Sequence, residues 1–259
     1  MLSRVRTVVA APVLALALAG CAYAQNANNT LPNAPLPQDP PSDAVTVRNT
    51  PRHLFSDQAA IWTSPLHLRD SNAAGPAILV LATAVLISTD HEIMSKHFQD
   101  TSLGNHAITA SDGLVGGFIA APVILYGLGQ IHHDDHASET GILAGESIID
   151  SLAVDEVLKL ASLRERPALD GARGRFFQPS VGFNSSFPSN HSVIAWSSAA
   201  AIATEYSGPL TQIAAYSLAT GVSVTRVVGR QHFPSDVLVG SAVGWMIGRY
   251  VVHRRRHAD

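Results

Sequence analysis

The sequence predicts an all-α fold, a multi-helix bundle with about six core helices. Apolar runs of helical length recur through the chain and are separated by polar, glycine or proline residues. No stretch shows sustained period-two alternation bounded by hairpin turns, which argues against an all-β fold. The apolar runs cover residues 76–88, 114–129, 142–160, 193–204, 210–228 and 237–252.

The N-terminus has the layout of a secretory signal. Arg4 and Arg6 precede an apolar segment at 8–18, and small residues follow it. Two cleavage sites compete: the sequence LAGC ending at Cys21 resembles a bacterial lipobox, and 22–24 forms an A-x-A-like site. Both predict export in a bacterium to the periplasm or envelope, and the first adds a lipid anchor at Cys21. Because Cys21 is the single cysteine, an internal disulfide is excluded.

Composition divides the rest of the chain. Residues 25–52 are rich in Asn, Pro and Asp and poor in apolar residues, which is typical of a disordered linker. Within the helical domain that follows, residues 53–72 predict a short amphipathic helix and a turn. We read one domain, since the signal and the linker account for the length beyond the common domain size. The predicted segments are a signal peptide at 1–24, a linker at 25–52, a helical domain at 53–252 and a basic tail at 253–259.

The helices carry mixed signals about a membrane. A span needs about 20 predominantly apolar residues, and most of the runs are shorter and rich in Ala, Gly, Ser or Thr. The mean hydropathy of +0.16 and the charged fraction of 14% favour a membrane nonetheless. We predict membrane association and leave open whether core helices span. Arg254, Arg255 and Arg256 fit anionic headgroups, a cytoplasmic stop or a solvated tail.

Three clusters of polar residues at the ends of the apolar runs predict the chemistry. They supply three fixed cations, two imidazoles and one carboxylate. A phosphoryl group in its transition state spreads negative charge over equatorial oxygens, so cationic clamping and positioning suit its transfer. Arginine matches such oxygens with a planar fork, and lysine acts as a point charge. The clusters are Lys159 with Arg166-Pro167, the segment 187–192 (FPSNHS), and Thr225-Arg226 with His232 and Asp236.

Two of these clusters also have residues typical of helix N-termini. Ser189 or Asn190 is placed as the N-cap of the run that follows, where free backbone N–H groups favour an anion. Pro234 suits a first helical turn after His232. Asp236 lies four residues beyond His232, so its carboxylate can bond one imidazole nitrogen and leave the other as a nucleophile.

These residues resemble a known family. The pattern K-x6-R-P, P-S-x-H and R-x5-H-x3-D is similar in order and spacing to the type 2 phosphatidic acid phosphatase and vanadium haloperoxidase superfamily, in its bacterial phosphatase branch. The resemblance covers about residues 90–252. Two positions depart from the pattern: Asn190 replaces the usual glycine and Thr225 the usual serine. Asn tolerates glycine-like conformations better than most residues, and Thr keeps the hydroxyl.

The resemblance implies a metal-independent phosphatase, without a cofactor, on a helical bundle of the acid phosphatase and haloperoxidase kind. It implies that His232 attacks phosphorus to give a phosphohistidine and that Asp236 orients His232. It further implies that His191 protonates the leaving oxygen and then activates water. Alternatives are a vanadate-dependent haloperoxidase and a non-catalytic envelope lipoprotein. The implied ligands of the phosphate oxygens are Lys159, Arg166, Ser189, Asn190 and Arg226.

The substrate is bounded less tightly than the reaction. A phosphomonoester or a pyrophosphate fits, and apolar helices favour a lipid phosphate; phosphatidic acid, phosphatidylglycerol phosphate, an isoprenyl diphosphate and glycolipid phosphates all stay open. A net charge of −3 argues against nucleic acid as a partner. The oligomeric state has no signal in the sequence. His132, His133 and His136 have the composition of a metal site but the polarity of a solvated loop, so we predict no metal there.

Overall fold

The computed structural model describes residues 44–64, 74–98 and 100–256. Among these residues no strand occurs, and α-helices alternate with short connections and two 3₁₀ helices, at Asp170–Ala172 and Pro179–Asn184. The predicted all-α class is confirmed. The α-helices are α2 (Thr50–Thr63), α3 (Ala74–His97), α4 (Thr101–His132), α5 (Asp135–Ser162), α6 (Asn190–Glu205), α7 (Pro209–Val228) and α8 (Pro234–Arg256).

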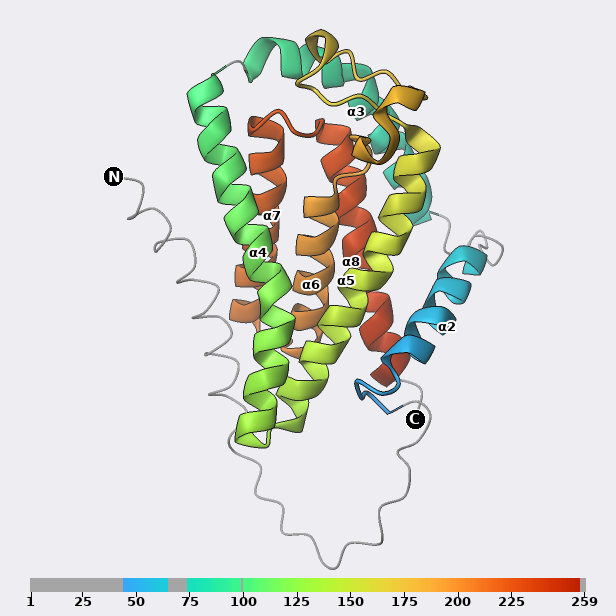
Figure 1. The fold of residues 1–259 in the computed structure, drawn as a ribbon, viewed down its shortest axis with the longest axis vertical. Helices are drawn as coiled ribbons and strands as arrows, with labels where there is room; N and C mark the ends of the chain where they lie inside the picture. The colour runs from blue at the N-terminus through green and yellow to red at the C-terminus, as the bar shows by residue number, and fades with distance from the viewer. Residues whose placement is uncertain (1–43, 65–73, 99, 257–259) are drawn as a thin grey trace, which may run out of the picture.

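The helices α4 to α8 form an elongated bundle around α6 (Figure 1). Helix α6 packs against α4, α5, α7 and α8, and α2 lies against α5. Helix α3 and the connection between α5 and α6 lie at the same end of the bundle (Figure 1). Each of the six predicted apolar runs falls within one of the helices α3 to α8, so the predicted core helices are all present.

Small residues set the close contact between α6 and α8. A Cβ atom at Gly240 would lie 2.6 Å from the carbonyl oxygen of Ser189, and one at Gly244 would lie 2.5 Å from that of Val193. Both separations are too short for a side chain, so glycine allows the two backbones to touch. Because Ser189 immediately precedes α6, this contact also fixes where α6 begins relative to α8.

Ion pairs hold the C-terminal arginines. Arg255 is buried and lies 2.6 Å from Asp57 of α2, and Arg254 lies 3.2 Å from the other oxygen of the same carboxylate. Arg256 pairs with Glu205 at 2.5 Å and with Glu139 at 2.7 Å. Helix α8 continues through Arg256. The three arginines therefore connect α8 to α2, α5 and α6, which differs from the headgroup-binding or solvated tail considered from the sequence.

The histidine-rich segment forms the turn between α4 and α5. His133 ends α4 in a left-handed conformation, with φ of 55°, and the Asp134 side chain caps α5 by accepting from the Ala137 N–H. His136 lies 3.0 Å from Glu205. In the ranges that the structure describes, no group of three His, Cys, Asp or Glu residues is arranged to hold a metal ion.

Two helices are long and apolar enough to cross a membrane, judged by length and composition. In the most apolar 18-residue window of each, 11% of the residues of α3 and 33% of those of α4 are buried. The predicted signal peptide, the lipobox at Cys21 and most of the predicted linker lie outside the described residues. These segments stay predictions.

Candidate active site

The predicted site residues come from helix ends at one end of the bundle. Helix α6 begins at Asn190 with Ser189 as its N-cap, and α8 begins at Pro234, as the sequence predicts. The Ser189 hydroxyl does not cap the backbone but accepts a hydrogen bond from Ser192 Oγ at 3.2 Å. Arg226 lies in the last turn of α7, and His232 lies in the connection to α8. Packing of α7 and α8 on α6 thus brings the second and third clusters together.

His232 is held in one tautomer by a backbone carbonyl. Its Nδ1 lies 2.7 Å from the carbonyl oxygen of Ser186, and a carbonyl can only accept, so Nδ1 carries the proton. The other nitrogen, Nε2, is buried and has no hydrogen-bond partner among the described residues. Burial, with the nearby charges of Arg166 and Arg226, lowers the pKa of His232 well below its usual 6.5. The ring is therefore neutral, with a bare lone pair on Nε2.

Asp236 does not make the hydrogen bond to His232 that its spacing predicts. Its Oδ2 lies 3.9 Å from His232 Nδ1, beyond hydrogen-bond distance. The carboxylate instead accepts from Ser186 Oγ at 2.5 Å and from the Phe233 N–H at 2.7 Å, as an acid in a first helical turn does. Arg164 contacts its other oxygen at 2.5 Å. Asp236 thus holds the Ser186 segment, and the Ser186 carbonyl in turn orients His232.

His191 and Arg226 meet at a carboxylate that lies outside the three sequence motifs. Asp112 Oδ1, on α4, lies 3.0 Å from His191 Nε2 and 3.0 Å from Arg226 Nη1. The Asn190 side-chain oxygen lies 3.1 Å from His191 Nδ1. Burial and the Arg226 charge lower the pKa of His191 to about 4, and the Asp112 carboxylate opposes that shift.

Arg226 also has an unused donor. Besides Asp112, it donates to Ser111 Oγ at 3.0 Å, whereas its Nε is buried with no hydrogen-bond partner among the described residues. A buried donor left unpaired costs about 1–3 kcal/mol, so such a group calls for an explanation. The bare Nε2 of His232 is a second buried atom of this kind in the same site.

The remaining predicted cations differ in how well they fit the cluster. Arg166 donates from Nε to the Asn184 side chain at 3.0 Å and from Nη1 to the carbonyl of Gln231 at 3.2 Å, next to His232. Lys159 is buried and lies 2.6 Å from Asp155 on its own helix. Its contacts among the described residues do not include another member of the predicted site.

A buried charge network supports the site from behind. Arg164 contacts Asp236 on α8 and lies 2.8 Å from Asp90 on α3, and its guanidinium stacks 4.0 Å from the Phe233 ring. Two sequence signals point to these residues. Arg164 lies inside the first motif, between Lys159 and Arg166, and Asp90 and Asp112 are acids in apolar surroundings. No sequence signal indicates the Ser186 carbonyl, because every residue has a backbone carbonyl.

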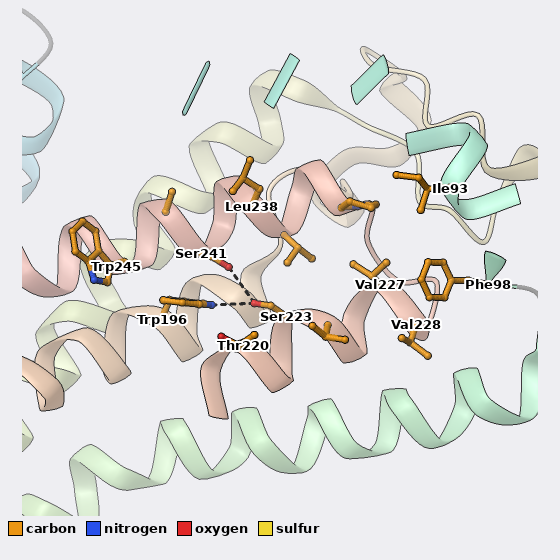
Figure 2. Close-up of a pocket in the computed structure, with 14 residues that line it drawn as sticks. Ile93, Phe98, Trp196, Thr220, Ser223, Val227, Val228, Leu238, Ser241 and Trp245 are labelled. Carbon is orange, nitrogen blue, oxygen red and sulfur yellow. Dashed lines mark hydrogen bonds between the residues drawn. The ribbon is translucent and has the colours of Figure 1, made fainter. Parts of the chain in front are cut away.

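An apolar groove of about 720 Å³ lies beside the site, between α7 and α8 (Figure 2). Trp196 of α6 lies beneath it, Trp245 stands at one end, and Ile93 and Phe98 from α3 and the segment after it stand at the other (Figure 2). The Ser223 and Ser241 hydroxyls hydrogen-bond to each other at 3.1 Å and belong to its floor. No pattern in the sequence indicates this groove.

Comparisons with known proteins agree with this architecture. Residues 140–258 match the sequence model of the PAP2 superfamily. A stretch of 65 residues, 24% of this chain, is 37% identical to the lipid A 1-phosphatase of Porphyromonas gingivalis and spans 15% of that protein. The fold is similar to the first transmembrane PAP2-type phosphatidylglycerolphosphate phosphatase from Bacillus subtilis, with a TM-score of 0.53, 20% identity and coverage of 71% of this chain and 97% of that one. The matched residues, 140–258, contain all three motifs, so the match to the PAP2 superfamily model agrees with the resemblance found in the sequence.

Proposed function

We propose that the protein is a metal-independent phosphatase that hydrolyses lipid phosphomonoesters or pyrophosphates through a phosphohistidine at His232. The observation that carries the proposal is the buried His232 ring, whose Nδ1 proton is held by Ser186 and whose Nε2 is bare. Such a nitrogen is a nucleophile that needs no base to activate it. The unpaired Nε of Arg226 supports the proposal, because a phosphate oxygen would satisfy it.

In the first step, the His232 Nε2 lone pair attacks phosphorus and the bond to the leaving oxygen breaks. His191 gives its proton to that oxygen, while Arg166 and Arg226 neutralise the charge that develops on the equatorial oxygens. An anionic phosphate raises the pKa of a neighbouring imidazole, which offsets the lowering at His191. Asp112 positions both His191 and Arg226 before the phosphate arrives.

In the second step, water attacks phosphorus, His191 takes a proton from the water, and the phosphorus–nitrogen bond breaks to release phosphate and neutral His232. Ser189, Asn190 and Lys159 remain in the proposal as further ligands of the phosphate oxygens. For Lys159 this role requires its ammonium to share or exchange its contact with Asp155.

Two observations support a lipid phosphate and a membrane location. The two relatives described above are named for lipid phosphates, lipid A and phosphatidylglycerolphosphate. Helices α3 and α4 are candidate membrane spans, and α3 exposes Ile78, Val80 and Leu81. We therefore place the enzyme at the envelope membrane of the cell, after export by the predicted signal.

The test is phosphate release from phosphatidic acid in detergent and from a soluble phosphomonoester, with a chelator present. We expect release by the wild type and a loss of more than about a thousandfold in His232→Ala, since removing a nucleophile is among the costliest changes to an active site. His106→Ala, an exposed histidine on α4, is the matched control and should keep full activity.

Three outcomes would contradict the proposal. They are a folded wild type that releases phosphate from no lipid phosphate or diphosphate, a His232→Ala variant that keeps its activity, and activity that the chelator abolishes. Halide oxidation that depends on added vanadate and peroxide would support the haloperoxidase alternative instead.

A further inference from the structure

The groove between α7 and α8 presents almost no polar group to a ligand. Its floor and walls include Trp196, Val224, Val227, Leu238 and Ala242. The hydroxyls in the lining already have partners within the protein. These partnerships are Trp196 Nε1 to Ser223 Oγ at 3.1 Å, Ser223 Oγ with Ser241 Oγ at 3.1 Å, and Thr220 Oγ1 to the Tyr216 carbonyl at 2.7 Å. The groove therefore offers apolar contact without hydrogen-bonding demand.

The groove adjoins the candidate site. Ser223 Oγ on its floor donates to Ser192 Oγ at 3.1 Å, and Ser192 Oγ donates to the Ser189 hydroxyl at 3.2 Å. Two lining residues flank the site along the chain: Val227 follows Arg226 directly, and Pro234 lies two residues after His232. One residue step spans about 3.8 Å between Cα atoms, so this end of the groove lies within a few ångströms of the site backbone.

The groove is elongated. Along α8 its lining runs from Pro234 to Trp245, which at the rise of an α-helix corresponds to about 16 Å. Figure 2 shows the lining side chains spread along the two helices from Trp245 to Phe98. Ile93, at the end of the groove nearest the site, belongs to α3, a candidate membrane span. An elongated apolar groove beside a candidate membrane span fits a hydrocarbon chain better than a compact ligand.

We infer that this groove binds an acyl chain of the substrate, with the phosphate at the His232 end and the chain running along α8 toward Trp245. The inference rests on the proposed phosphatase function and deepens it, because it assigns a site to the part of the substrate that does not react. Binding energy from such a remote part contributes to kcat/KM. Each buried methylene should raise kcat/KM by about fourfold until the groove is full.

The test uses n-alkyl monophosphates of increasing length, each kept below its micelle-forming concentration. We expect kcat/KM of the wild type to rise with each methylene and then to level off. Ala242→Phe places a ring in the groove and should lower the ratio of kcat/KM between long and short chains by about tenfold or more. Met246→Phe, an exposed position on α8 outside the lining, is the matched control and should keep the wild-type ratio.

A second variant covers the case in which Ala242→Phe does not fold. Leu238→Ala removes apolar contact without adding bulk, and it should make the rise per methylene shallower. The inference is overturned if the wild type cleaves all alkyl phosphates equally, or if folded Ala242→Phe or Leu238→Ala keeps the wild-type ratio. A wild type that cleaves none of the alkyl phosphates and no lipid phosphate would overturn the proposed function itself, which is a different result.

Discussion

The two histidines of the site face partners of different kinds, and this difference supports the roles proposed for them. His232 donates from Nδ1 to a carbonyl oxygen, which does not change its charge with pH. His191 lies against the Asp112 carboxylate, which favours a proton on the ring. Burial lowers the pKa of both rings, but only His191 has a carboxylate beside it that opposes the lowering.

This assignment predicts that Asp112→Asn will affect substrates unequally. An amide cannot stabilise the His191 proton as a carboxylate does, so protonation of the leaving oxygen should suffer. We expect turnover of an alkyl phosphate, whose alkoxide is a poor leaving group, to fall by about a hundredfold. Turnover of p-nitrophenyl phosphate should fall by only a few-fold, because its leaving group, p-nitrophenolate, departs without protonation. The measurement is turnover against the pKa of the leaving alcohol or phenol.

The control for that experiment is Asp135→Asn. Asp135 is an exposed acid in the first turn of α5. It should leave both substrates at wild-type rates. If Asp112→Asn lowers turnover of both substrates by the same factor, Asp112 has only a structural part in the site.

At the scale of elements, α8 depends on its glycines. Gly244→Val should destabilise the protein by about 1–3 kcal/mol, because a Cβ there would lie 2.5 Å from the Val193 carbonyl oxygen and would force α6 and α8 apart. The melting temperature in detergent measures the effect. Gly127→Ala, on α4 with no atom within 4 Å of the added Cβ, is the control and should be neutral or slightly stabilising. A Gly244→Val protein that melts like the wild type would contradict the close packing of these helices.

The apolar runs predict which segments are helical but not where the helices end. Each predicted run lies inside a longer helix, because polar residues at the flanks are also helical once the apolar face is packed. The ends are set by caps such as Asp100, which accepts from the Ser102 and Leu103 N–H groups, and Asp134. The start of α8 is predictable because Pro234 suits the first turn of a helix, which is also a local feature.

The candidate site was predictable only as far as its motifs extend. Spacing along one helix suggested that Asp236 bonds His232, but Arg164 and the Ser186 hydroxyl, from distant parts of the chain, occupy that carboxylate. Asp112 lies on α4, far from the motifs in sequence, so its contact with His191 depends on how α4 packs. Such contacts are tertiary, and no local pattern encodes them.

At the scale of the whole molecule, the first described helix is fastened to the last. Arg255 and Asp57 are 198 positions apart in sequence and both are buried. Arg255→Met should cost about 3 kcal/mol, the lower end of the range for breaking a buried pair, because Arg254 remains 3.2 Å from Asp57. Denaturation in detergent measures the change, and Arg249→Met on the same helix is the control. Loss of no more than the control would mean that Arg254 alone compensates Asp57.

The carbonyl of Ser186 has a consequence for how this chemistry persists through evolution. A backbone oxygen cannot be deleted by any substitution, so the reactive face of His232 is inherited through the path of the chain rather than through a side chain. A substitution at position 186 keeps this acceptor and removes only the hydroxyl that donates to Asp236.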